Sequence, residues 1–76
     1  MEIKVLGPGC AKCKKLAENC QEAIKLSGKE VNFEYITDLQ RIMEYGVLMT
    51  PGLVINGKVV SVGRVLPVKE ILGYMN

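Results

Sequence analysis

The chain has 76 residues, of which 49% are hydrophobic, and a formal net charge of +2. A chain this short can enclose only one core, which predicts a single domain over residues 1–76. The small net charge excludes a strongly basic nucleic-acid binder, and no apolar run approaches the length of a membrane span. Because the first residues also lack the basic and apolar regions of a secretion signal, we expect a soluble, cytoplasmic protein without nucleic acid or membrane as a partner.

The first half of the chain predicts a strand, a helix and a second strand. Residues 2–6, EIKVL, alternate polar and apolar side chains and end at Gly7-Pro8-Gly9, as a strand entering a tight turn does. Residues 10–27 then place apolar or small side chains on one helical face, and Gly28 provides a stop. Residues 30–36, EVNFEYI, alternate again and predict a strand.

The second half predicts a short helix, a hairpin and a final helix. Thr37-Asp38 offers an N-cap for a stripe that stops at Gly46. Asn56-Gly57 suits a two-residue turn between strands at 53–55 and 58–62, and Pro67 suits the first residue of a helix. The order βαβαββα predicts an α/β fold with a four-stranded mixed sheet flanked by helices.

Cysteine is the candidate reactive residue type of this chain, since the chain contains three cysteines and no histidine. Cys10 and Cys13 form a C-x-x-C pair where the first strand meets a helix, a position that favours redox chemistry over inert packing. The helix N-terminus, together with Lys12 and Lys14, should stabilise the Cys10 thiolate and lower the pKa of Cys10.

The two sulfurs of this pair should therefore differ. Cys13 lies one turn further along the helix, on its apolar face. An exposed, acidic thiol beside a shielded one predicts thiol–disulfide exchange, in which Cys10 attacks a substrate disulfide and Cys13 releases the product. Gly7 and Gly9 would let the loop turn sharply and admit another chain close to the sulfur.

The third cysteine, Cys20, falls two helical turns beyond Cys13, which is too far for an unstrained disulfide. We interpret it as a small core residue, with a regulatory or metal-ligating role as the minor alternative.

A second motif, Met49-Thr50-Pro51-Gly52, precedes the hairpin. The residues alone favour a trans bond before Pro51, since cis is the minority state of such bonds. A cis bond facing the cysteines would instead free the backbone of Thr50 to pair with an extended substrate segment.

Two stretches together resemble the thioredoxin superfamily: CAKC after a strand, and YGVLMTPGLVINGKVVSVG from Tyr45 to Gly63. The likeness covers nearly the whole chain and is closest to the small, glutaredoxin-sized redox-active disulfide proteins. It implies a thioredoxin-like fold, Cys10 as nucleophile, Cys13 as resolving cysteine, and a substrate site formed by Thr50 and a cis Pro51. Gly9 would admit the substrate backbone to this site, and Lys12 could pair with an anion.

The resemblance also implies an activity, that of a dithiol–disulfide oxidoreductase. Such an enzyme passes electrons from an upstream reductase of the thioredoxin-reductase type to oxidised protein substrates. Its cofactor is the redox-active Cys10–Cys13 pair itself, without a metal. The chain departs from thioredoxins in having Gly9 where they usually have tryptophan, Ala-Lys inside the motif, and no aspartate in the first strand. It also lacks the glycines and acidic residues that hold glutathione in glutaredoxins.

The main alternative is a soft-metal chaperone that binds Cu or Zn through the same cysteine pair. Such domains resemble βαββαβ and end in a strand, whereas this chain predicts a final helix. They also usually carry a methionine two residues before the first cysteine, where this chain has Pro8. A redox-silent scaffold or sensor is a third alternative.

Overall fold

The computed structural model describes all of residues 1–76. Its elements follow the chain in the order β1 (Glu2–Leu6), α1 (Ala11–Ser27), β2 (Asn32–Ile36), α2 (Leu39–Glu44), β3 (Gly52–Ile55), β4 (Lys58–Val62) and α3 (Val68–Met75). None of these helices combines the length and the apolar content that crossing a membrane requires.

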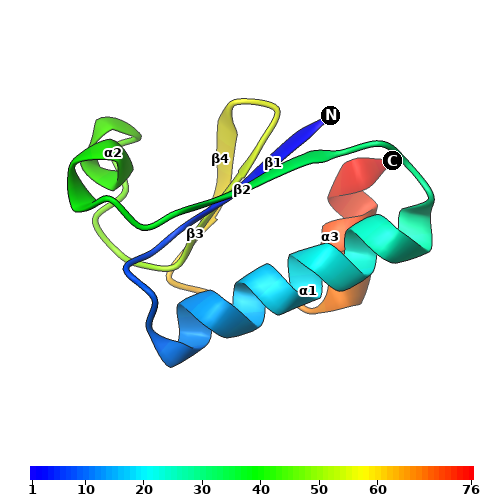
Figure 1. Cartoon of the computed structure of the whole chain (residues 1–76), viewed down its shortest axis with the longest axis horizontal. Helices are drawn as coiled ribbons and strands as arrows, with labels where there is room; N and C mark the ends of the chain where they lie inside the picture. The colour runs from blue at the N-terminus through cyan, green and yellow to red at the C-terminus, as the bar shows by residue number, and fades with distance from the viewer.

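The four strands form one mixed sheet in the order β2-β1-β3-β4. Strand β1 pairs in parallel with β2 and antiparallel with β3, and β3 pairs antiparallel with β4. Helices α1 and α3 lie together on one face of the sheet, and α2 lies apart from them at one end (Figure 1). The predicted α/β fold, with its βαβαββα order and flanked mixed sheet, is confirmed.

Most element boundaries agree with the local sequence. Gly28, with φ of 67°, ends α1 in the left-handed conformation that glycine tolerates. The Asp38 carboxylate caps α2 by accepting the Gln40 N–H at 3.0 Å. At the hairpin, Asn56 and Gly57 have φ of 51° and 81°, as the two-residue turn requires.

Several boundaries differ from prediction by one or two residues, and β3 begins at Gly52 instead of residue 53. Strand β2 begins at Asn32 instead of residue 30, because its neighbour β1 begins at Glu2 and the Asn32 N–H donates to the Met1 carbonyl. Pro67 is the N-cap of α3, one residue earlier than the helical position we expected.

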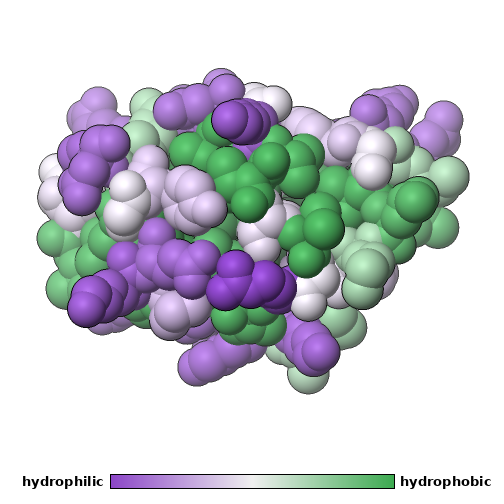
Figure 2. All heavy atoms as spheres, turned by 180° about the vertical axis from the view of Figure 1, so that it is seen from behind, coloured by the Kyte–Doolittle hydropathy of each residue, from purple (hydrophilic) through white to green (hydrophobic).

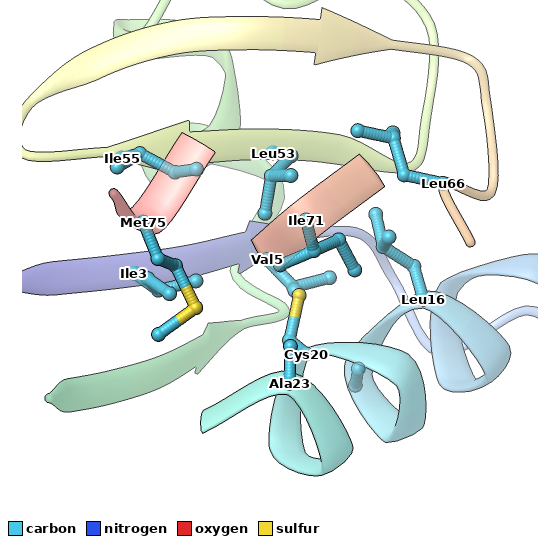
Figure 3. Close-up of a cluster of buried hydrophobic side chains, with 11 residues drawn as sticks. Ile3, Val5, Leu16, Cys20, Ala23, Leu53, Ile55, Leu66, Ile71 and Met75 are labelled. Atoms are coloured by element: carbon cyan, nitrogen blue, oxygen red, sulfur yellow. The ribbon is translucent and has the colours of Figure 1, made fainter. Parts of the chain in front are cut away.

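The main core lies between the sheet and helices α1 and α3 (Figure 3). Cys20 points from α1 into this cluster and has no exposed surface, so its interpretation as a core residue is confirmed. Burying a large aliphatic side chain in such a cluster contributes roughly 1.5–3 kcal/mol. The fully buried side chains include Ile3, Val5, Leu16, Leu53, Leu66 and Ile71.

The opposite face of the sheet carries a smaller cluster of five buried residues: Leu6, Ile36, Ile42, Val47 and Val54. Helix α2 contributes only Ile42 to it. Leu39 and Met43, which belong to the same predicted stripe, are more than half exposed. The stripe therefore predicted the helix correctly, but only one of its residues is buried.

Candidate active site

The cysteine pair sits where the loop after β1 enters α1. Cys10 is the N-cap of α1, and its Sγ accepts a hydrogen bond from the Cys13 N–H at 3.3 Å. Its carbonyl accepts the first helical bond, from the Lys14 N–H at 3.0 Å. Gly9 precedes it with φ of 101°, a left-handed conformation that side chains disfavour. The prediction that the helix begins at the motif is confirmed.

The pKa of Cys10 is lowered, as expected, although the causes differ from those we inferred from the sequence. The Cys13 thiol hydrogen-bonds to Cys10, and this is the largest cause; the Cys13 backbone N–H is the next. Backbone N–H groups of the first helical turn, including that of Lys12, add to the effect. The lysine ammonium groups are not among these leading causes.

Cys13 has the opposite environment. Its side chain is completely buried, whereas Cys10 is exposed, and both are free thiols. Burial raises the pKa of Cys13, and its hydrogen bond to Cys10 raises it further. The expected difference between an exposed, acidic sulfur and a shielded one is therefore present in the structure.

Gly7 has a different role from the one we expected. A Cβ atom at Gly7 would lie only 2.3 Å from the Cys13 Sγ, so this buried glycine makes room for the sulfur and not for another chain. The same position is 3.9 Å from the Pro51 Cα. Gly7 is thus the point at which the end of β1, the Cys13 sulfur and Pro51 meet.

The Thr50–Pro51 peptide bond is cis. The residues alone favoured trans, and that inference is wrong; the family resemblance implied cis, and that expectation is confirmed. Local sequence cannot decide the isomer, because Pro51 is buried against segments distant in the chain. The Pro51 carbonyl accepts the Gly63 N–H at 2.8 Å, whereas the N–H and C=O of Thr50 make no hydrogen bond within the chain.

The charged residues near the site are less closely involved. Lys12 is exposed on the first turn of α1 and is not part of any ion pair. Arg64, which follows Gly63, makes two hydrogen bonds of 3.2 Å to the Glu70 carboxylate. The chain contains no group of three or more histidine, cysteine or acidic residues arranged to hold a metal ion.

Two apolar side chains beside this site were given no role in the sequence analysis, although Met49 belongs to the motif quoted there. Leu48 and Met49 directly precede Thr50, and they are 92% and 64% exposed. Hydrophobic atoms are open to solvent at the end of the molecule that α2 and this loop occupy, as Figure 2 shows from behind. The sequence did offer an indication, since Leu48 and Met49 are an apolar pair outside any predicted helix or strand, shortly before Pro51.

Comparison with known proteins assigns the chain to a family. The model of the thioredoxin domain matches residues 1–76. The chain belongs to the thioredoxin family. A thioredoxin of Methanothermobacter thermautotrophicus is 39% identical over 71 residues, covering 93% of this chain and 92% of the relative. A thioredoxin of Methanocaldococcus jannaschii is 33% identical over 69 residues, covering 91% and 79%. This thioredoxin-family chain is a thiol–disulfide oxidoreductase, an activity that fits a protein-disulfide reductase.

Proposed function

We propose that the chain reduces protein disulfides with Cys10 as the nucleophile and Cys13 as the resolving cysteine. The observation that carries this proposal is the contrast between the two sulfurs. Cys10 is exposed and has a lowered pKa, whereas Cys13 is fully buried and has a raised one. The thiolate is the nucleophile in disulfide exchange, so the first attack should come from the sulfur that is both more acidic and reachable.

The reaction has two exchanges. The Cys10 thiolate attacks one sulfur of the substrate disulfide, and the other substrate sulfur leaves as a thiolate that takes up a proton. The Cys13 thiolate then attacks the Cys10 Sγ, which forms the Cys10–Cys13 disulfide and releases the second substrate sulfur. Two electrons pass to the substrate, and the cysteine pair is oxidised.

An upstream disulfide reductase of the thioredoxin-reductase type would return the two electrons. The redox-active Cys10–Cys13 disulfide is then the only cofactor required, and no metal takes part. A cycle that keeps the pair reduced belongs in a reducing compartment, which for this chain we take to be the cytoplasm. Its partners are proteins, and the proposal involves neither nucleic acid nor a membrane.

The substrate site we propose is formed by Thr50 and Pro51, with Gly9 and Lys12 at its edge. The unpaired N–H and C=O of Thr50 suit an extended segment that pairs backbone to backbone. Leu48 and Met49 offer exposed apolar surface beside it. Gly9 has no side chain to block an approach to Cys10. Lys12 has no ion-pair partner of its own, which leaves it available to an acidic group.

The architecture supports this reading over a soft-metal chaperone. The chain ends in helix α3, while the chaperone domains that share the C-x-x-C pair resemble folds that end in a strand. Membership of the thioredoxin family points in the same direction.

The decisive experiment follows reduction of a protein disulfide by the wild type and by Cys13→Ser, with Cys20→Ala as the matched control. We expect the wild type and Cys20→Ala to turn over. Cys13→Ser should stop after the first exchange as a covalent adduct, and peptide mapping should locate the bond at Cys10. Failure of Cys13→Ser to trap an adduct at Cys10, or stoichiometric binding of Zn or Cu(I) by the wild type without turnover, would overturn the proposal.

A further inference from the structure

One buried polar group near the cysteine pair has no partner. The Tyr35 hydroxyl is buried, and it makes no hydrogen bond. A hydroxyl removed from water without a partner costs free energy, so most buried polar groups are paired. This unpaired hydroxyl therefore calls for a physical explanation.

The sheet register places Tyr35 on the Cys13 side. Tyr35 in β2 pairs with Val5 in β1, and its side chain packs against the cluster beneath α1 and α3. Side chains alternate along a strand, so Gly7 follows Val5 on the same face. Gly7 is the residue whose missing Cβ accommodates the Cys13 sulfur. Burial raises the pKa of Tyr35, and negative charge on Cys13 and Cys10 raises it further.

The resolving step creates a need for such a group. Cys13 must lose its proton to attack the Cys10 Sγ, yet burial disfavours its thiolate. The charged groups of the neighbouring elements are directed elsewhere. Lys4 contacts Tyr45 and Glu34, which lie on the opposite face of the sheet, and Lys12 and Lys14 are exposed on α1. Strand β3 carries no titratable side chain, and the Glu70 carboxylate of α3 is paired with Arg64. Two buried hydroxyls lack a partner, those of Tyr35 and Ser61, and only that of Tyr35 belongs to a titratable side chain whose charge interaction includes Cys13.

We propose that Tyr35 is a positioning residue for the resolving step, whose hydroxyl donates a hydrogen bond to the Cys13 thiolate as it forms. This inference rests on the proposed function, because it assumes that Cys13 attacks the mixed disulfide. Tyr35 keeps its proton throughout. The Cys13 proton passes to solvent, the thiolate attacks the Cys10 Sγ, the bond between Cys10 and the substrate sulfur breaks, and that sulfur leaves with the electron pair.

The unpaired hydroxyl of the reduced structure follows from this role. A neutral thiol is a weak acceptor, whereas a thiolate is a strong one, so the donor gains its partner only when Cys13 ionises. The Tyr35 hydroxyl thus lowers the stability of the protein while Cys13 is a thiol, and it stabilises Cys13 once the thiolate forms. Removing the Tyr35 oxygen should therefore slow the resolving step without lowering the free energy of unfolding. A residue that only packs would not show this combination.

The test compares the wild type with Tyr35→Phe, and uses Tyr74→Phe on the exposed surface of α3 as the matched control. Thiolate absorbance is titrated in a Cys10→Ser background, where Cys13 is the only thiol at the site. We expect Tyr35→Phe to lower the fraction of Cys13 thiolate at neutral pH by about tenfold, the effect of losing one charge-assisted hydrogen bond. Tyr74→Phe should leave the titration unchanged.

Two further measurements use the protein with both cysteines. Release of a preformed mixed disulfide at neutral pH should slow by about threefold in Tyr35→Phe, since the less acidic thiolate is also the better nucleophile. The first attack by Cys10 should be unaffected. The free energy of unfolding of the reduced protein should be unchanged or higher, because the lost oxygen had no partner.

An unchanged Cys13 titration in Tyr35→Phe would overturn the inference, as would a loss of stability with no change in the titration. A wild-type protein that never reduces a protein disulfide would instead refute the proposed function. In that case the titration alone would still decide whether Tyr35 stabilises the Cys13 thiolate.

Discussion

Replacing Gly7 with alanine gives the most direct test of how the site is packed. Gly7 is buried and has no left-handed φ, so the added methyl group acts through space and not through backbone strain. Its Cβ would lie 2.3 Å from the Cys13 Sγ and 2.9 Å from the Cys13 Cβ. The sulfur must withdraw by about 1 Å to reach an ordinary contact distance. It cannot do so freely, because Cys13 has no exposed surface.

Two magnitudes follow. Overpacking of this kind costs about 1–3 kcal/mol of the free energy of unfolding. A displacement of about 1 Å can slow a reaction by about 10²-fold, and in the mechanism we propose the affected step is the attack of Cys13 on the mixed disulfide. Denaturant titration measures the first, and rapid-quench analysis of adduct decay measures the second. Gly73→Ala is the matched control, because a Cβ there meets nothing within 4 Å; within a helix it should be neutral or stabilising by about 0.5–1 kcal/mol.

The cost of Gly7→Ala should also shrink when Cys13 is replaced with alanine, since the closest contact then disappears. The steric account fails if Gly7→Ala is as stable as the wild type and resolves its adduct at the same rate. It fails as well if the cost is the same with and without the Cys13 sulfur.

Three further outcomes are expected. Leu53→Ala should lower the free energy of unfolding by about 2–5 kcal/mol, because Leu53 is fully buried in the main core; denaturant titration with a loss below about 1 kcal/mol would contradict that packing. Burial raises the pKa of Cys20 from 9.0 to about 12, so the folded chain keeps a proton that the unfolded chain loses. The resulting stability is full below pH 9 and is lost as the pH rises toward 12, and Cys20→Ala should show a shallower decline in an alkaline denaturation series. Cys13→Ala removes the leading cause of the lowered pKa of Cys10, so iodoacetamide should label Cys10 more slowly at neutral pH but equally fast in strong alkali. An unchanged rate at neutral pH would mean that the first helical turn stabilises the thiolate without Cys13.

The elements predictable from the sequence are those that depend on neighbouring residues. Asn56-Gly57 determines its hairpin turn through backbone preferences that need no tertiary contact, and Gly28 ends α1 for the same reason. The burial of Cys13 also followed from periodicity, since a helix that packs on a sheet must bury one face.

The parts that could not be predicted depend on distant segments. Gly7 looked like a loop glycine, and only the position of α1 above the end of β1 shows that its missing side chain accommodates a sulfur. The isomer at Pro51 likewise reflects surroundings supplied by other segments. The apolar stripe of α2 indicated a helix but did not show which of its residues the rest of the chain buries. Two of them, Leu39 and Met43, face solvent.

The uneven cover of the sheet has a consequence for motion. Helix α2 is held to its face of the sheet mainly by Ile42, while α1 and α3 share an extensive cluster with the strands. Segments with few buried side chains open locally at lower free energy than the core, so amide hydrogens of α2 should exchange sooner than those of α1. The loop that carries Leu48 and Met49 continues from this loosely held helix, whereas the two sulfurs belong to the firmly held one. In the substrate site we propose, recognition could thus adapt to differently shaped protein surfaces while the two sulfurs keep their geometry.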